Sequence, residues 1–343
     1  MDSKAVCDLL VFLHRNLNFL SKVLTSSISV ERALDLFSAG NVLCNAGLRQ
    51  YSRWRTGGVA DYLVRPATAQ QVADVIAYLH ESGIPWVAIG HTSNVLISDA
   101  KICGVVLQVT DKLSQILIED QNVRAQAGVW VPRFAKTVAG KGLAGAEHII
   151  GIPGTIGGLI CMNGGSMRRG IGENVVSVRC VDTSGNELLL SQQECCFGYR
   201  KSKIQESGLI VTEATFKFSP GDRSILRKQM LEILRSRRKK FPLKLPNCGS
   251  VFVSDPAMYQ THGPPGAVID RCALKGFRIG DAQVSTKHSN FVVNLGNATS
   301  DDIISVVKHV RDTCWRLEGV KLQTEVKYLT SECQLVPLHD VLL

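Results

Sequence analysis

Apolar residues recur at helical spacing in three long segments of the chain, which predicts three amphipathic helices. Their expected bounds are residues 69–82, 223–238 and 300–317. The second helix ends before Pro242, because proline cannot continue a helix. The third begins at Ser300-Asp301-Asp302, short polar side chains of the kind that cap helix N-termini.

Short apolar runs bounded by polar residues or glycine predict β-strands between and after these helices. The expected strands lie in residues 60–66, 85–90, 104–109, 251–253 and 290–294. In the first half of the chain, strand signals alternate with helix signals. This order favours an α/β or α+β fold and argues against a helix bundle.

The chain has 343 residues, more than one hydrophobic core usually supports, so we expect more than one domain. Residues 1–42 predict a helical extension, because their leucines recur at helical spacing. This segment has no basic leader and no apolar stretch long enough to span a membrane. We expect one domain over residues 43–219, a second over residues 220–328 and a tail over residues 329–343, because the turn-forming Ser219-Pro220-Gly221-Asp222 precedes the second helix.

Composition limits the possible classes of protein. Apolar residues make up 45% and charged residues 20%, values of an ordinary soluble globular protein. The net charge of +9 suits anionic partners, and the densest basic run lies in residues 235–244. That run lacks the interleaved aromatic residues of a single-stranded nucleic-acid platform, so a solvated helix end and an anion site both stay open.

The 11 cysteines include no Cys-x-x-Cys pair, which argues against a disulfide framework and against a zinc site. An odd number would also leave at least one thiol unpaired. Reduced thiols in the cytosol are the simplest explanation, so we expect a cytoplasmic protein without a bound metal.

Two segments are rich in glycine, a residue that destabilises a fold unless the backbone turns sharply or approaches another group closely. They are Gly90-His91-Thr92-Ser93-Asn94-Val95, directly after a predicted strand, and GIPGTIGG over residues 151–158. Loops of this kind expose backbone N–H groups that can bind a pyrophosphate. Neither contains the Gly-x-Gly-x-x-Gly or Gly-Lys-Ser/Thr motif, so each alone could be a tight structural turn.

In their order along the chain, these loops and the glycine motifs around Gly57, Gly128 and Gly145 resemble the FAD-binding half of the UDP-N-acetylenolpyruvoylglucosamine reductases. This family is a branch of the vanillyl-alcohol-oxidase flavoproteins, which share the PCMH-type fold. The resemblance implies an α+β protein with a PCMH-type FAD-binding domain of two α+β subdomains and a smaller α+β substrate-binding domain. The flavin would lie between the subdomains, with loops rather than a Rossmann helix around its pyrophosphate.

The residues that would bind FAD follow from the same resemblance. They are Arg55, Thr56, Gly57, Gly90, His91, Thr92, Ser93, Asn94, Val95, Gly128, Gly145, Gly151, Ile152, Pro153, Gly154, Thr155, Gly157, Gly158 and Asn163. The family usually has further glycines at the positions of His91 and Thr92. The backbone is therefore expected to approach the cofactor less closely there.

Three further segments resemble the catalytic motifs of the family. FGYRKS matches the segment whose arginine, here Arg200, faces the enolpyruvyl carboxylate. NCGSVF matches the segment with the proton-donating serine, here Ser250, and LQTEVK matches the segment with the catalytic glutamate, here Glu325.

These residue types suit the reduction of a carbon–carbon double bond next to a carboxylate. A guanidinium stays charged and can bind a carboxylate through two parallel hydrogen bonds. A hydroxyl can supply the proton, and a buried carboxyl with a raised pKa can donate a hydrogen bond to the developing anion. Plainer explanations stay open: a surface ion pair for Arg200, a backbone hydrogen bond for Ser250, and an exposed pair of Glu325 with Lys321 or Lys327.

The resemblance also implies substrate-binding residues: Tyr199, Lys240, Asn247, Lys275, Lys287, His288 and Asn290. The lysines could bind the uridine diphosphate, and Lys240 alternatively NADPH, although each could be a solvated surface lysine. A structural role is favoured for His288 over a general base. The segment between Ser202 and Val211 is too short for the additional tyrosine-bearing loop of one branch, so the chain resembles the type II branch.

Together the resemblance implies a reductase that uses FAD and NADPH. NADPH reduces the flavin, which then reduces UDP-N-acetylglucosamine enolpyruvate to UDP-N-acetylmuramate for peptidoglycan synthesis. We expect no nucleic-acid partner and no membrane insertion; the sequence does not establish the oligomeric state, and a monomer is our expectation. Two alternatives stay open: a flavin oxidase or dehydrogenase of alcohols or sugars with FAD tethered through His91, and a non-enzymatic protein that binds polyanions through residues 235–244.

Overall fold

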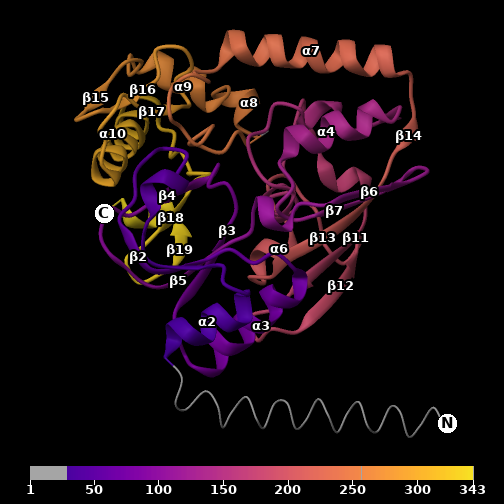
Figure 1. The fold of residues 1–343 in the computed structure, drawn as a ribbon. Coiled ribbons are helices and arrows are strands. Elements are labelled where there is room, and N and C mark those ends of the chain that lie inside the picture. Colours follow the sequence, from indigo (N-terminus) through magenta and orange to yellow (C-terminus); the bar gives the residue numbers. More distant parts are fainter. Residues whose placement is uncertain (1–28, 256, 343) are drawn as a thin grey trace, which may run out of the picture.

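The computed structural model describes residues 29–255 and 257–342, and its arrangement is shown in Figure 1. The leucines that predict the helical extension, Leu9 to Leu24, lie outside the described residues. The chain builds two α+β subdomains and then a C-terminal α+β part, which confirms the predicted α+β class. Among the described helices, none combines the length and the apolar character that a membrane span requires.

The first subdomain is built on a four-stranded sheet. Its strands, in spatial order, are β1 (Val42–Gly47), β2 (Val59–Val64), β5 (Ile102–Gln108) and β3 (Trp86–Ile89). β1 is antiparallel to β2, whereas β2, β5 and β3 are parallel to one another. The predicted first helix is confirmed as α3 (Ala69–Glu81), which packs against α2 (Val30–Ser38). It begins at Thr68, whose hydroxyl accepts a hydrogen bond from the Gln71 amide.

The second subdomain is built on a five-stranded antiparallel sheet. Its strands, in spatial order, are β12 (Glu187–Ser191), β11 (Val175–Val181), β13 (Ile210–Lys217), β7 (Asn122–Gln126) and β6 (Ile116–Glu119). Helix α4 (Val131–Gly140) packs on it through Phe134, whose ring centroid lies 4.9 Å from that of Phe216. The remaining short elements are β8 (Leu143–Ala144), α5 (Ile156–Cys161), β9 (Gly165–Ser166), β10 (Arg169–Gly170), α6 (Lys203–Glu206) and β14 (Ser219–Pro220).

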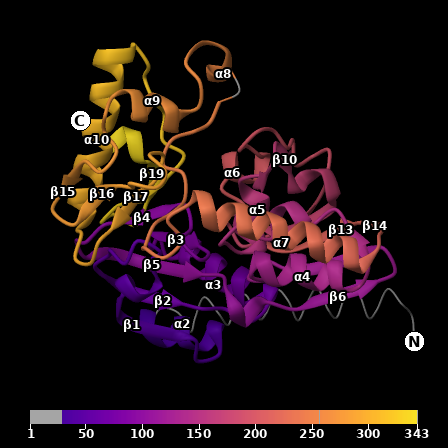
Figure 2. The same cartoon turned by 90° about the horizontal axis from the view of Figure 1, so that it is seen from above.

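The predicted second helix is confirmed as α7 (Arg223–Lys240), which crosses from the second subdomain to the C-terminal part (Figures 1 and 2). The carboxylate of Asp222 caps it by accepting hydrogen bonds from the first backbone amides. The C-terminal part has a three-stranded antiparallel sheet against which the predicted third helix packs. Its elements are α8 (Met258–Thr261), α9 (Pro265–Arg271), β15 (Arg278–Ile279), β16 (Ala282–Val284), β17 (Val292–Asn294) and α10 (Ser300–Glu318).

Two details predicted for this part are wrong. The N-cap of α10 is Thr299 rather than Ser300, because Thr299 and Asp302 each accept a hydrogen bond from the other's backbone amide. Residues 251–253 form no strand, because their backbone makes only one isolated antiparallel bridge, between Phe252 and Thr324.

A small mixed sheet joins the C-terminus to the first subdomain. Strand β18 (Lys327–Leu329) pairs in parallel with β4 (Val95–Ile97) and antiparallel with β19 (Leu335–Pro337). Trp54 makes a second connection, because it is fully buried in the C-terminal core and its indole N–H donates to the Val292 carbonyl at 2.8 Å. Since β4 directly follows the first glycine loop, these contacts place the segment before β18 beside that loop.

Candidate active site

Arg200 and Glu325, two of the predicted catalytic residues, form an ion pair although they are far apart in sequence. Arg200 Nε lies 3.3 Å from Glu325 Oε1, and the two side chains are 28% and 15% exposed. Arg200 lies in a tight turn with a left-handed backbone (φ 57°), and its Nη2 donates to the Gly165 carbonyl at 3.5 Å. The ion pair is mostly buried, and the exposed pairing of Glu325 with Lys321 or Lys327 is not what the structure shows.

Backbone hydrogen bonds bring Ser250 to the same place. The Glu325 amide donates to the carbonyl of Val251 at 2.8 Å, so Ser250, the preceding residue, lies beside the Glu325 segment. The Ser250 side chain is half-buried, and its hydroxyl has no hydrogen-bond partner within the described part of the chain. On the other side, the Asn94 side-chain amide donates to the Glu325 carbonyl at 2.9 Å. The first glycine loop, the Ser250 segment and the Arg200 turn therefore meet at Glu325, which precedes β18 rather than lying within a strand.

Burial raises the pKa of the Glu325 carboxyl above its ordinary value, and the Arg200 guanidinium opposes this rise. The carboxyl therefore holds a proton to a higher pH than an exposed glutamate does. A protonated carboxyl donates a hydrogen bond, whereas the ionised form only accepts one. Glu325 can thus stabilise negative charge that develops beside it.

The two glycine loops pack against each other next to this cluster. A Cβ atom on Gly90 would lie 2.5 Å from the Thr155 hydroxyl oxygen, and a Cβ on Gly154 would lie 3.0 Å from the Ser93 hydroxyl oxygen. Thr155 also caps α5, because its hydroxyl accepts a hydrogen bond from the Gly158 amide at 3.3 Å. The close approach leaves room only for glycine at Gly90, and the surface that the loops present is mainly backbone.

A cavity of about 120 Å³ lies between these loops and the sheets of both subdomains. Glycine backbone forms part of its wall at Gly90, Gly157 and Gly158, and apolar residues such as Ile89 and Val109 form most of the rest. A wall of this kind suits the nucleotide end of a dinucleotide, whose ring is apolar and whose phosphates bind backbone amides. The residues that line this cavity therefore fit the nucleotide end of FAD.

Two predicted FAD-binding side chains are bonded within the protein instead. The Thr92 hydroxyl donates to the Tyr51 carbonyl and accepts from the Arg53 amide, both at 3.0 Å. The Asn163 side chain donates to the Gly198 carbonyl and accepts from the Gly172 amide, both at 2.9 Å. These side chains hold the loops in shape, so only their backbone groups are available to a cofactor.

The isolated glycines of the predicted set are packing positions. At Gly57 and Gly145 an added Cβ would contact neighbouring atoms at 3.1 and 3.0 Å, and at Gly128 it would overlap the backbone of a neighbouring loop. Arg55 is exposed in a left-handed conformation (φ 57°). The Thr56 hydroxyl, in contrast, is buried without a hydrogen-bond partner, so it remains a candidate ligand group.

His91 lines a separate pocket of about 420 Å³ together with Arg53, Arg65 and Trp130. Burial lowers the pKa of its imidazole, and the two arginines act in the same direction while Asp111 opposes them. His91 is therefore expected to be neutral at neutral pH.

Two predicted substrate-binding residues support the Ser250 segment. The Asn290 side chain accepts a hydrogen bond from the Phe252 amide and donates one to the Phe252 carbonyl, both at 2.9 Å. The Asn247 side chain donates to the carbonyls of Pro242 and Leu245 at 3.2 and 2.7 Å. Both amides therefore position the segment that carries the predicted proton donor.

The other predicted substrate-binding residues differ in their surroundings. Lys287 donates to the Arg238 carbonyl at 2.6 Å, and Lys275 forms an ion pair with Asp270 at 3.2 Å. His288 packs against two phenylalanine rings, and burial lowers its pKa, which agrees with the predicted structural role. The charges of Lys275 and Lys240 also lower the His288 pKa, so both lysines lie near this imidazole.

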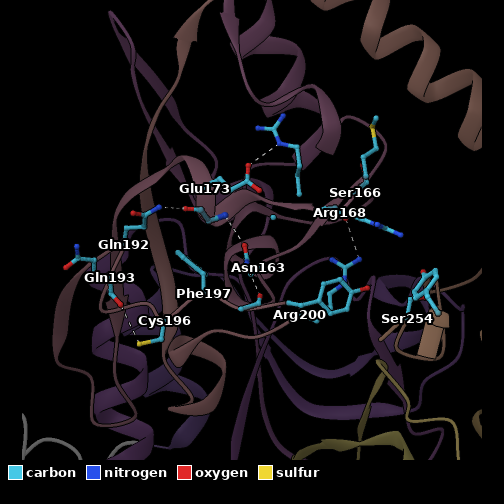
Figure 3. Close-up of a pocket in the computed structure, with 18 residues that line it drawn as sticks. Asn163, Ser166, Arg168, Glu173, Gln192, Gln193, Cys196, Phe197, Arg200 and Ser254 are labelled. Carbon is cyan, nitrogen blue, oxygen red and sulfur yellow. Dashed lines mark hydrogen bonds and ion pairs between the residues drawn. The ribbon is translucent and has the colours of Figure 1, made fainter. Parts of the chain in front are cut away.

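A pocket of about 900 Å³ opens beside Arg200, as Figure 3 shows. The β9–β10 hairpin lines it on one side and Tyr259 of the C-terminal part on another. Tyr199 is 49% exposed, and its ring centroid lies 5.7 Å from the Arg200 guanidinium carbon. Lys240 lines a neighbouring cavity of about 730 Å³ between α7 and the same hairpin. Sequence reasoning missed this hairpin, although the glycines before and after it are a typical hairpin signal.

Comparisons with known proteins identify the family. Residues 60–191 match the FAD binding domain family, and residues 241–329 match the family described as UDP-N-acetylenolpyruvoylglucosamine reductase, C-terminal domain. The chain is 41% identical over 294 residues to UDP-N-acetylenolpyruvoylglucosamine reductase 1 of Corynebacterium glutamicum, which covers 86% of this chain and 88% of that protein. It is 35% identical over 286 residues to the corresponding reductase of Moorella thermoacetica, covering 83% of this chain and 92% of that protein.

A solved structure is also similar. The crystal structure of UDP-N-acetylenolpyruvylglucosamine reductase from Thermus caldophilus aligns with a TM-score of 0.70 and 27% sequence identity, covering 84% of this chain and 97% of that chain. The two family matches contain both glycine loops, Ser250 and Glu325. The fold, the cofactor loops and the similarity over most of the chain show that this protein belongs to the UDP-N-acetylenolpyruvoylglucosamine reductases, an FAD-dependent oxidoreductase family.

Proposed function

We propose that this enzyme reduces the enolpyruvyl group of UDP-N-acetylglucosamine enolpyruvate, with NADPH as the electron donor, and releases UDP-N-acetylmuramate. The observation that carries the proposal is the meeting of Arg200, Glu325 and the Ser250 segment beside the glycine loops that fit FAD. The 41% identity to the Corynebacterium glutamicum reductase supports the same substrate.

Bound FAD would supply the hydride, and side chains of this chain supply the remaining chemistry. Arg200 pairs with the Glu325 carboxylate at 3.3 Å, and protonation of Glu325, which its raised pKa favours, frees the guanidinium for the substrate carboxylate in the same place. Glu325, with its pKa raised by burial, donates a hydrogen bond where negative charge collects on that carboxylate. Together the two residues stabilise the charge that develops when hydride adds to the methylene carbon.

Ser250 supplies the proton for the carbon that bears the carboxylate. Its hydroxyl has no partner within residues 29–255 and 257–342, whereas the backbone around it is held by Asn290 and Glu325. A donor with a fixed backbone and an unengaged hydroxyl can be aligned with the reacting carbon.

The pocket of about 900 Å³ beside Arg200 and the neighbouring cavity of about 730 Å³ would hold the nucleotide part of the substrate. Lys240 is the predicted substrate-binding lysine that lines one of these cavities, so we propose it as a ligand of a phosphate group. Lys275 and Lys287 bond to other groups of the chain, which makes them weaker candidates. We also propose that the enzyme acts in the cytoplasm as a monomer, over the predicted domain bounds 43–219 and 220–328.

Spectroscopy with the purified protein tests this proposal. The protein should be yellow, acid denaturation should release the flavin into solution, and NADPH should bleach it under anaerobic conditions. Subsequent addition of the UDP-sugar should restore the colour and form UDP-N-acetylmuramate. A flavin that stays attached after acid treatment would favour a tethered oxidase, and a colourless protein that binds polyanions would favour the non-enzymatic alternative.

A further inference from the structure

The β9–β10 hairpin ends in a turn of unusual composition. Ser166 and Arg169 are paired, and the two residues between them, Met167 and Arg168, both have left-handed backbones with φ of 58° and 64°. Two-residue turns of this kind favour asparagine and glycine, because a Cβ atom is strained at positive φ. Arg168 therefore occupies a position that a residue with a Cβ atom does not favour.

Among the arginines that line the large pocket, Arg168 has no acidic partner within the described part of the chain. Three arginines line this pocket, and the other two, Arg169 and Arg200, form ion pairs with glutamates at 3.1 and 3.3 Å. The Arg168 guanidinium carbon lies 5.8 Å from the ring centroid of Tyr259, and it forms no ion pair with any described residue. Its charge is therefore available to an anionic ligand.

Arg168 lies within reach of a ligand that also contacts Arg200. Gly165, at the base of the hairpin, accepts a hydrogen bond from Arg200, and Arg168 lies three residues further along. Because the hairpin turns back at Met167 and Arg168, the Gly165 and Arg168 Cα atoms lie closer than the about 10 Å that three extended residues span. Figure 3 shows the Arg200 guanidinium directed at the hairpin that carries Arg168. A ligand that reacts beside Arg200 can place a second, charged group at Arg168.

We infer that Arg168 binds the 2′-phosphate of NADPH and thereby sets the preference of the enzyme for NADPH over NADH. The inference rests on the proposed function, in which NADPH reduces the enzyme. NADPH differs from NADH only in this phosphate, which lies at the opposite end of the molecule from the nicotinamide. A guanidinium binds phosphate through charge-assisted hydrogen bonds, and the neighbouring Tyr259 ring offers a face on which the adenine can stack.

The substitution Arg168→Asn removes the charge and keeps a residue that tolerates a left-handed backbone, so the hairpin should still form. Anaerobic stopped-flow absorbance then measures flavin reduction by NADPH and by NADH. The half-saturating NADPH concentration should rise about 10- to 100-fold, the range for a hydrogen bond to a charged group, while that of NADH stays constant. Arg168→Lys should retain part of the preference, and Arg124→Gln, an exposed position on β7, is a charge-matched control.

Calorimetry gives a second measurement that does not depend on turnover. The FAD-loaded wild type should bind adenosine 2′,5′-bisphosphate more tightly than AMP, and Arg168→Asn should lose this difference. Equal weakening of NADPH and NADH, weakening of the UDP-sugar alone, or no effect would each show that the inference is wrong. Absence of flavin reduction by NADPH in the wild type would instead refute the proposed function itself.

Discussion

Replacement of Ser250 by alanine tests the proposed proton donor directly. The backbone around Ser250 does not depend on its hydroxyl, because Val251 accepts a hydrogen bond from the Glu325 amide at 2.8 Å and Asn290 bonds both backbone groups of Phe252 at 2.9 Å. The side chain is half-buried and its hydroxyl makes no hydrogen bond with the described residues. Ser250→Ala should therefore change the free energy of unfolding by less than about 0.5 kcal/mol, so any large rate change reports on the hydroxyl.

The expected effect falls on one of the two half-reactions. Reduction of bound FAD by NADPH requires no proton from Ser250, so its rate should stay near that of the wild type. Oxidation of the reduced enzyme by the UDP-sugar should slow about 10³-fold, within the range for loss of a general acid, which is a barrier increase of about 4 kcal/mol.

Anaerobic stopped-flow absorbance of the flavin measures both rates separately. Ser177→Ala is the matched control, because Ser177 is likewise half-buried but lies on β11, away from the pockets described above, and both of its rates should stay close to those of the wild type. Equal slowing of the two half-reactions in Ser250→Ala would remove this residue from the proton-donor role.

Three further predictions concern the cofactor loops, the supporting amide and the buried carboxyl. Gly90→Val should yield protein with little FAD, measured as flavin absorbance per protein, because even a Cβ would lie 2.5 Å from the Thr155 hydroxyl; full FAD content would contradict the proposed loop contact. Asn290→Ala should lower the free energy of unfolding in urea by about 2–4 kcal/mol, because it leaves two buried backbone groups of Phe252 unpaired, and an unchanged value would refute the positioning role. Because burial raises the pKa of Glu325, its neutral carboxyl contributes to the free energy of unfolding. This contribution is fully present below pH 4.5, the ordinary pKa of glutamate, and is lost as the pH rises through the folded-state pKa. The urea midpoint of Glu325→Gln should therefore fall less than that of the wild type between pH 4.5 and neutral pH. Plots of urea midpoint against pH that run parallel for the two proteins would contradict this.

Most of the local structure could be predicted from the sequence. Helices α3, α7 and α10 have the predicted apolar spacing, and their ends lie within a few residues of the expected positions. The strand predicted at residues 251–253 is wrong, because these residues have no neighbouring strand to pair with among the described residues. Their apolar character comes from burial in the C-terminal core.

For the predicted cofactor residues, too, the sequence predicted local features but not long-range contacts. The sequence indicated which loops carry glycine, but the roles of Thr92 and Asn163 depend on distant backbone groups at residues 51–53, 172 and 198. A hydrogen bond between residues tens of positions apart leaves no periodic signal in the chain. The β9–β10 hairpin escaped notice for a related reason, because its pairing involves only two residues on each side.

The sequence by itself determined the elements, the positions of the glycine loops and the residue types suited to carboxylate binding and proton transfer, because these follow from local spacing and side-chain chemistry. Only the tertiary structure decided that Arg200 pairs with Glu325, and that Ser250 lies beside them. This arrangement depends on burial in two hydrophobic cores and on the pairing of β4 with β18, which joins segments from opposite ends of the chain. Burial also raises the pKa of Glu325, since the loss of water around a carboxylate is a property of the packed fold rather than of its sequence neighbours.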